Sequence, residues 1–236
     1  MHNVLKVLLF CCFFGSFAQE VKKNEIKTPV DSLYREDQFY FNITYNSLRN
    51  VPSGFSQNKF SPGIALGFLR DMPLNKKRTF ALALGLGYSL STYNGTMYIY
   101  KGSDTNGNET QNYEIISEDI YYRTNRISFH YLDIPLEIRW RNSTYESHKF
   151  WRIYTGLKVS YLFSNTYKFE NGLETVTIKN NPDLNKIQYG IYLTSGWNTW
   201  NFYVYYGLNP IFKSGTIGNE NIKFNTLNIG LQFYIL

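Results

Sequence analysis

The chain has 236 residues, of which 43% are hydrophobic and 18% charged, and its mean hydropathy is −0.34. This length suits one domain or one large barrel. The net charge of +6 is scattered, with no basic block longer than Lys76–Arg78, so it predicts no nucleic-acid partner. Aromatic residues make up 18%, including 21 Tyr and 18 Phe. This composition is typical of transmembrane strands, because only every second residue of such a strand faces lipid.

The N-terminal segment predicts a secretory signal peptide. Lys6 precedes the apolar run Val7–Phe14, and the small residues Ser16 and Ala18 stand where a signal peptidase reads. We expect cleavage between Ala18 and Gln19. The run is shorter than the roughly 20 residues that a spanning helix needs, and no other segment is long and apolar enough.

Both cysteines, Cys11 and Cys12, lie inside the predicted signal peptide. The mature protein would therefore have no disulfide and no cysteine–metal chemistry. The sequence divides into a signal peptide at 1–18, a flexible polar periplasmic lead at 19–36, and a barrel domain at 37–236.

Eight segments alternate between apolar and polar residues with a period of two, which is typical of strands with one apolar face. Each reaches or approaches the roughly 9–11 residues that a tilted spanning strand needs. The segments are 39–46, 60–68, 79–90, 127–140, 150–167, 187–194, 201–208 and 227–235.

The breaks between these segments alternate between long and short. The long ones include 94–125 and 171–185, and the short ones include a turn at 71–75 and another at 197–200. Outer-membrane barrels have short periplasmic turns, longer extracellular loops and an even strand number. We therefore predict an all-β, eight-stranded antiparallel transmembrane barrel in the outer membrane with both termini periplasmic. Parts of the 94–125 loop are expected to extend the neighbouring strands.

The fourth segment is expected to be irregular. Its apolar residues change parity after Tyr131, which predicts a β-bulge near Tyr131–Leu132. Pro135 cannot donate a hydrogen bond to a strand ladder. Under this interpretation Phe129 and Tyr131 share the outward, lipid-facing side with Leu132.

The polar faces of the fourth and fifth segments carry large charged residues, whereas the second and third carry Gly and Ala. An eight-stranded barrel has an interior that side chains fill. Unpaired buried charges are costly, so we predict a luminal ion network. One register places Asp133 opposite Lys158 and Arg139 opposite Arg152, and an alternative register pairs Glu137 with Arg152. The predicted network consists of Asp133, Glu137, Arg139, Arg152 and Lys158.

The chain's four tryptophans flank two of the predicted short turns. Aromatic girdles form at membrane interfaces. We therefore expect a belt on the periplasmic side, made of Trp140, Trp151, Trp197 and Trp200.

Catalytic candidates are few. Ser128 and His130 share one strand face, and with a carboxylate such as Glu137 they would make a Ser-His-acid set. The parity change after Tyr131 argues against a face shared with Glu137. His130 and His148 lack metal-ligand spacing, and we expect no metal, no cofactor and no catalytic residue.

The stretches YLDIPLEIRWR, FWRIYTGLKVSYLF, KIQYGIYLTSGWNTWNFYVYYGLNPIFK and LNIGLQFYIL resemble the PorT proteins of Bacteroidetes. The resemblance spans Phe39–Leu236 and is clearest from Tyr131 onward. The Ile134–Pro135 pair also occurs in other small Bacteroidetes barrels. The turn Trp197–Trp200 and the segment Gly207–Phe212 favour the narrower match.

This resemblance implies a small, non-enzymatic outer-membrane barrel that serves type IX protein secretion as an assembly or accessory component, and gliding motility in gliding species. The expected partners are outer-membrane lipid, the barrel-assembly machinery and other type IX secretion components. Two alternatives are a structural or adhesive role through the extracellular loops, chiefly 94–125, and a lipid-modifying hydrolase that uses Ser128 and His130.

Overall fold

The computed structural model describes residues 37–235 except 76, 104 and 143–150. The predicted signal peptide, its cleavage site at Ala18 and Gln19, and the polar lead lie outside these residues. None of the described segments forms a helix with the length and hydropathy needed to cross a membrane.

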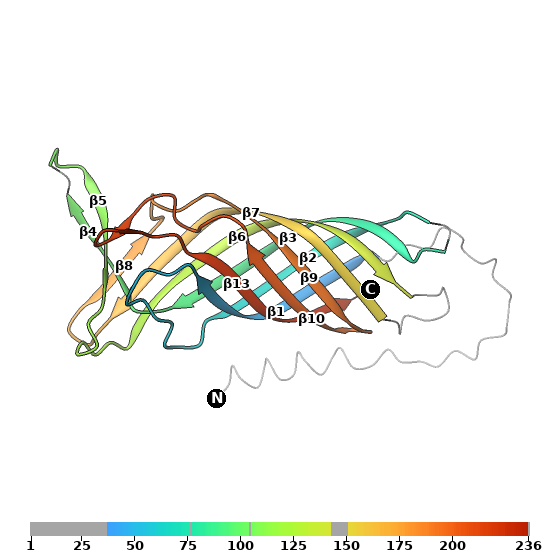
Figure 1. Cartoon of the computed structure of the whole chain (residues 1–236), viewed down its shortest axis with the longest axis horizontal. Helices are drawn as coiled ribbons and strands as arrows, with labels where there is room; N and C mark the ends of the chain where they lie inside the picture. The colour runs from blue at the N-terminus through green and yellow to red at the C-terminus, as the bar shows by residue number, and fades with distance from the viewer. Residues whose placement is uncertain (1–36, 76, 104, 143–150, 236) are drawn as a thin grey trace, which may run out of the picture. The chain divides into compact units, whose positions relative to one another are not determined.

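Eight antiparallel strands close into a barrel, as predicted (Figure 1). The sheet order is β6-β3-β2-β1-β13-β10-β9-β7, and pairing of β6 with β7 closes it. The barrel strands are β1 (Gln38–Arg49), β2 (Pro62–Pro73), β3 (Phe80–Asn94), β6 (Thr124–Arg141), β7 (Trp151–Glu170), β9 (Ile187–Trp197), β10 (Trp200–Gly207) and β13 (Asn225–Ile235).

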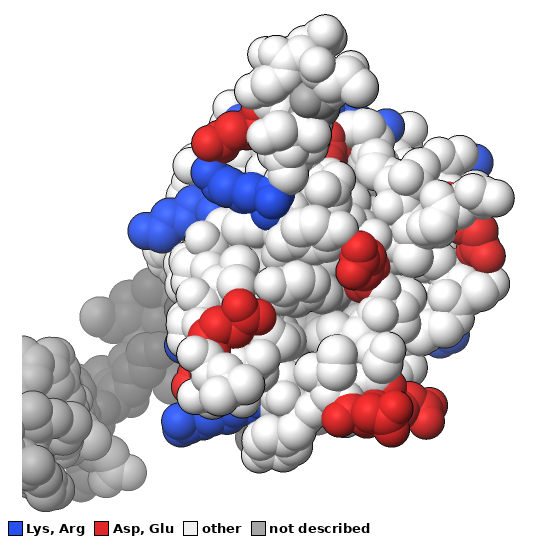
Figure 2. All heavy atoms as spheres, turned by 90° about the vertical axis from the view of Figure 1, so that its left-hand side faces the viewer, with Lys and Arg blue, Asp and Glu red and all other residues white. Residues whose placement is uncertain are grey.

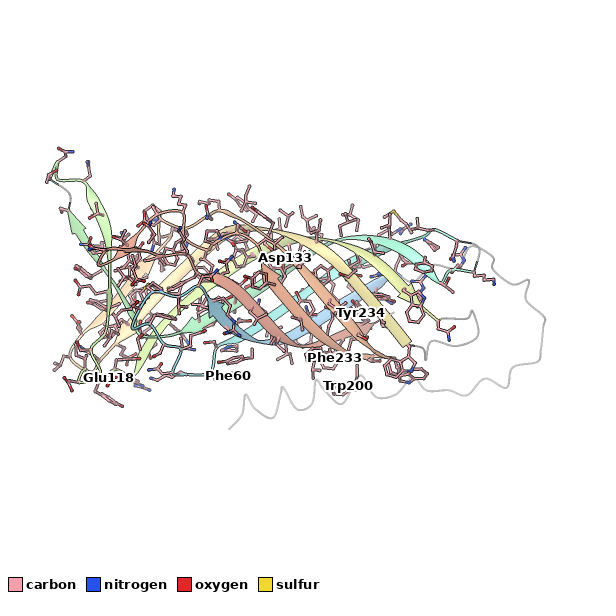
Figure 3. All side chains as sticks on the ribbon, in the orientation of Figure 1. Phe60, Glu118, Asp133, Trp200, Phe233 and Tyr234 are labelled. Atoms are coloured by element: carbon pink, nitrogen blue, oxygen red, sulfur yellow. The ribbon has the colours of Figure 1, made fainter. Side chains whose placement is uncertain are left out.

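Burial along these strands alternates residue by residue because successive side chains point to opposite faces. On β1, Phe39 and Ile43 are exposed on the outer wall, whereas Tyr40 and Asn42 point into the barrel. The outward apolar side chains form a continuous band, here called the apolar belt, which runs on β6 from Trp140 up to Leu132. Figure 3 shows Trp200 on the outer wall and Asp133 within the barrel.

The connections alternate in length around the barrel, as predicted. The short turns, with the start of β1 and the end of β13, gather at one end, and the long loops gather at the other (Figure 1). The tightest turn is Asn198–Thr199, where Trp197 pairs with Trp200 and Asn198 has a positive φ.

The long loops contain strands of their own, whereas the sequence predicted only extensions of the barrel strands within 94–125. β4 (Met97–Ser103) and β5 (Glu109–Ile115) form a separate hairpin and do not extend the neighbouring barrel strands. β8 (Thr175–Lys179) pairs with β7 beyond the barrel. β11 (Thr216–Ile217) and β12 (Glu220–Asn221) form another small hairpin.

The predicted β-bulge is present, but the parity change assigned to it was wrong. The register between β6 and β7 shifts between His130 and Tyr131, where His130 pairs with Ser164 and Tyr131 pairs with Leu162. The extra residue is therefore Phe163 on β7. On β7 the residues that face inward are therefore even-numbered before Phe163 and odd-numbered after it. On β6 the alternation is unbroken, and Phe129 and Tyr131 are both buried inside the barrel.

The irregularity expected at Pro135 also appears. The ladder between β3 and β6 pairs Leu84 with Leu136 and resumes at Gly87 with Asp133, and it leaves out the two positions around Pro135. A proline has no N–H to give to a neighbouring strand, which accounts for this gap.

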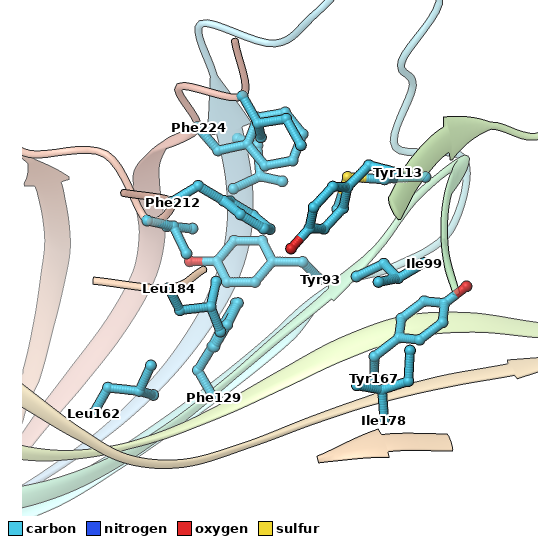
Figure 4. Close-up of a cluster of buried hydrophobic side chains, with 14 of the residues drawn as sticks. Tyr93, Ile99, Tyr113, Phe129, Leu162, Tyr167, Ile178, Leu184, Phe212 and Phe224 are labelled. Carbon is cyan, nitrogen blue, oxygen red and sulfur yellow. The ribbon is translucent and has the colours of Figure 1, made fainter. Parts of the chain in front are cut away.

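Phe129 and Tyr131 belong to a large hydrophobic cluster at the long-loop end of the barrel (Figure 4). Phe129 packs edge-on against Tyr93, with ring centroids 5.8 Å apart. The loops supply much of the cluster, including Phe212 from the segment between β10 and β11. This cluster caps the lumen beneath the loops.

Candidate functional site: a plugged lumen beneath a loop platform

A buried ion network fills the short-turn end of the lumen. Arg139 donates from Nε to Glu137 Oε2 at 2.7 Å and from Nη1 to Asp71 Oδ1 at 2.9 Å. Arg141 donates from Nη1 and Nη2 to the two oxygens of Asp71, each at 2.8 Å. The Asp71, Arg139 and Arg141 side chains are 0% exposed. Bidentate arginine–carboxylate geometry is the strongest form of this contact.

A second charged group lies further along the lumen. Lys158 Nζ is 3.6 Å from Asp133 Oδ2, and Ser160 donates its hydroxyl hydrogen bond to Asp133 Oδ1. Lys158 also lies over the ring of Tyr205, 4.3 Å from its centroid. Asp133, Glu137, Arg139 and Lys158 are thus brought into ion pairs inside the barrel.

Arg152 is buried in the same lumen, where its guanidinium lies over aromatic rings. Its Cζ is 5.2 Å from the ring centroid of Tyr234 and 5.9 Å from that of Tyr154. Neither Arg139 nor Glu137, the two residues that the predicted registers placed opposite Arg152, lies there, because Arg152 pairs across the strands with Arg141.

Both predicted registers between the two charged strands were wrong. Asp133 lies opposite Ser160, Glu137 opposite Gly156, and Arg139 opposite Tyr154. The physical reason lies outside this strand pair. Asp71 on β2 forms an ion pair with Arg141, which offsets the repulsion between Arg141 and Arg152 at opposed positions. This register was not among those predicted from the sequence.

Asp71 and Arg141 are network members that the sequence reasoning missed. Asp71 was placed in a turn at 71–75, but β2 continues to Pro73. The small residues Ala81 and Ala83 on β3 lie between Asp71 and the charged residues of β6 and leave room for the contact. A usable signal was present, because Asp71 keeps the odd parity of the lumen-facing residues of its strand.

Side chains nearly fill the lumen between the ion network at the short-turn end and the hydrophobic cap at the long-loop end. A cavity lined by Tyr40, Asp133 and Lys158 measures about 10 Å³, and another lined by Ser89, Lys158 and Tyr205 about 20 Å³. Such cavities hold a water molecule or so each. The arrangement favours a closed barrel over an open channel.

We therefore expect the purified barrel to conduct no ions. Inserted into a planar lipid bilayer, it should give a current that cannot be distinguished from the protein-free membrane, while a porin recorded in parallel gives discrete steps. Reproducible single-channel steps from the purified protein would contradict a lumen plugged by these side chains.

The four tryptophans lie at the short-turn end of the barrel on consecutive strands. All four are exposed on the outer wall. Trp151 and Trp197 meet edge-on with ring centroids 5.6 Å apart, and Trp200 meets Phe233 at 4.9 Å. Their position is the one expected of an interfacial girdle; that role stays a prediction.

Ser128 and His130 do not assemble with Glu137. They share one face of β6, as predicted, and that face is the outer one, whereas Glu137 points into the lumen. His130 Nδ1 lies 2.7 Å from the hydroxyl of Tyr88, and the Ser128 hydroxyl lies 3.4 Å from that of Thr92. This arrangement does not supply the acid that a Ser-His-acid set requires.

Above the hydrophobic cap, polar contacts join the loops into one platform. Tyr113 on β5 donates to Asp183 Oδ2 at 2.7 Å, and Ser214 donates to Asp183 Oδ1 at 2.7 Å. Burial and the hydrogen bond to Asp183 raise the pKa of the Tyr113 hydroxyl far above its usual value, so it stays a donor. Three loops therefore meet at Asp183.

A polar groove of about 640 Å³ lies on this platform, between the β4–β5 hairpin, the segment around Asp183, and β11. Its acidic lining residues are Glu109, Glu114 and Asp183. Figure 2 looks onto this end, where most of the surface is uncharged and acidic and basic side chains occur in small scattered groups. Among the residues placed in the structure, no group of three or more His, Cys, Asp or Glu could hold a metal ion.

Comparison with known families agrees with this architecture. The profile of the family described as outer membrane protein beta-barrel domain matches residues 17–213. The chain belongs to this family. It is therefore an outer-membrane β-barrel protein, and the predicted fold class is confirmed.

Among solved structures, the barrel is similar to Ail, the attachment invasion locus protein of Yersinia pestis, with 11% identity and a TM-score of 0.39 over 86% of this chain and 100% of Ail. A structure of Ail in complex with the heparin analogue sucrose octasulfate matches at 12% identity, with the same TM-score and coverage. Among curated proteins, none matches the chain.

Proposed function

We propose that this outer-membrane barrel is a non-enzymatic, non-conducting component of type IX protein secretion that acts in assembly or as an accessory. The observation that carries the proposal is the doubly plugged lumen, with an ion network at one end and a hydrophobic cap at the other. A barrel closed in this way offers its surfaces to partners and not a path through its centre. The PorT-like sequence stretches supply the link to type IX secretion.

In this proposal the short turns and both termini face the periplasm, and the loop platform faces the exterior. The tryptophan end of the apolar belt then marks the periplasmic interface. The partners are outer-membrane lipid, the barrel-assembly machinery that inserts the strands, and other type IX secretion components. No catalytic step is assigned to Ser128 or His130.

Deletion of the gene should block type IX export. We expect secreted cargo to disappear from the culture medium and to accumulate in the periplasm, as measured by immunoblots of both fractions. Complementation with the wild-type gene should restore export, and Ser128→Ala with His130→Ala should restore it equally. Normal export by the deletion strain would refute the proposal, and failure of the double variant alone would point to the hydrolase alternative.

A structural or adhesive role is the second candidate, and the loop platform favours it. The β4–β5 hairpin is held in place at Asp183 and borders a groove large enough for a ligand. A strain in which residues 97–115 are replaced by a short Gly-Ser linker separates the two functions. Loss of surface binding with normal export would support adhesion, and loss of export with normal binding would support secretion.

A further inference from the structure

The outer wall of the barrel changes from apolar to polar side chains above the apolar belt on β6 and β7. On β6 the outward side chains change from Leu132 to polar residues that include Arg126. On β7 they change from Phe163 to polar residues that include Lys168. The alternation continues, because Asn125 and Phe169 on the same stretches are buried inside. The outward residues of this region therefore lie on the opposite face of the strands from the hydrophobic cap.

Basic residues gather on this wall. Arg126 pairs directly across the strands with Lys168, so their side chains lie next to each other on the outer face. Lys179 on β8 pairs with Thr166, which places it on the same face one step closer to the belt. Arg126 and Lys179 are exposed. We call these three residues the basic wall: Arg126, Lys168 and Lys179.

The charges of the basic wall are poorly balanced by the protein. Like charges placed directly opposite each other on a sheet are unfavourable. Glu170 is the acid that compensates, with Lys168 Nζ at 3.1 Å and Arg123 Nη1 at 3.5 Å from its carboxylate oxygens. In the part of the chain that the structure describes, neither Arg126 nor Lys179 has an ion pair. An anion from outside the protein would balance this surplus positive charge.

The height of the wall indicates which anion lies beside it. The belt ends at Leu132 on β6, and Arg126 is six residues further along the strand, a rise of about 15 Å for a tilted strand. Lys179 lies nearer to the belt. Long basic side chains extend toward an adjacent headgroup layer while their stems lie along the protein surface. The wall is thus continuous with the lipid-facing surface and stands at headgroup level.

We propose that the basic wall binds the phosphate groups of an anionic glycolipid in the outer leaflet. Arg126 supplies paired N–H donors that match phosphate oxygens, and the two lysines supply point charges. The neighbouring hydroxyls of Ser128 and Thr166 on the same face add donors. The inference rests on the proposed orientation, with the long loops outside the cell, and would fix the barrel's position beside that lipid.

Binding can be measured on the purified, refolded full-length barrel in non-ionic detergent with fluorescent lipid A as the probe. We expect Arg126→Gln with Lys179→Gln to weaken binding about tenfold or more, because each basic residue near an anionic lipid surface contributes on the order of 1 kcal/mol. The matched control is Arg49→Gln with Lys223→Gln, two exposed basic residues on the β1–β13 side, which should leave binding unchanged. Heat-modifiability on gels verifies that all variants are folded.

The proposal would be overturned by equal binding of dephosphorylated lipid A, by an equal loss in the control pair, or by tighter binding of a soluble heparin oligosaccharide than of lipid A. A preference for phosphatidylglycerol over lipid A would also overturn it and would place the long loops in the periplasm. Because the assay uses purified protein, its outcome is independent of whether the deletion strain exports cargo.

Discussion

Asp71→Asn will remove roughly 3–5 kcal/mol from the free energy of unfolding, the cost of leaving a buried charge without its partner. The substitution keeps the shape of the side chain, so no cavity contributes. Arg141 loses a carboxylate that accepts two hydrogen bonds at 2.8 Å, and Arg139 loses one at 2.9 Å. All of these groups lie in the lumen, where water cannot replace the lost contacts.

Urea unfolding in detergent micelles measures the effect, with the girdle tryptophans as the fluorescent probe. Glu109→Gln is the matched control, because the Lys101–Glu109 ion pair has a similar length of 2.8 Å but both side chains are mostly exposed, at 58% and 74%. An exposed pair contributes about 0–1 kcal/mol, so the control should unfold close to wild type. Equal midpoints for Asp71→Asn and wild type would show that the network does not hold the barrel together.

The barrel itself was predictable from local patterns. Period-two alternation identified the strands, and the alternation of loop lengths identified the end at which each loop lies. Strand parity also placed Asp133, Glu137, Arg139 and Lys158 in the lumen, because inward position depends only on the count of residues from a known outward neighbour. These features are properties of single strands, so one sequence is enough to reveal them.

Strand register was not predictable, because it depends on residues from other strands. The sequence offered two pairings for β6 and β7, and each was judged on those two strands alone. The observed pairing sets Arg141 against Arg152 and is favoured by contacts from other strands, above all by Asp71, which reaches Arg141 from β2. Asp71 itself was hidden by the turn-like residues that follow it, Pro73 and Asn75.

The hydrophobic cap was missed for a different reason. Within the belt, apolar residues face lipid and polar residues face the lumen, and the same rule was applied to the whole of β6. Beyond the belt the surroundings are aqueous, so the rule reverses and apolar side chains turn inward to a core of their own. The apolar residues of β6 change from odd to even numbers at Tyr131 because the environment changes there. The strand itself keeps its alternation, with odd-numbered residues inward throughout.

Phe129→Ala tests that reversal, and we expect it to cost about 3–5 kcal/mol of unfolding free energy. Phe129 is 1% exposed and packs in the cap against Tyr93 and Tyr131. Removing its ring leaves a cavity beneath the loops. Phe163, the bulge residue on β7, is 50% exposed on the outer wall, so Phe163→Ala leaves no internal cavity and should cost less, about 1–2 kcal/mol.

The two variants should also differ at the loop platform. The cap supports the β4–β5 hairpin through Met97, Ile99 and Tyr113, which belong to the same cluster as Phe129. Limited proteolysis should therefore cut between residues 95 and 123 faster in Phe129→Ala than in Phe163→Ala or wild type. If Phe129 faced lipid, as its sequence pattern suggested, the two variants would be cut at equal rates and Phe129→Ala would unfold no more readily than Phe163→Ala.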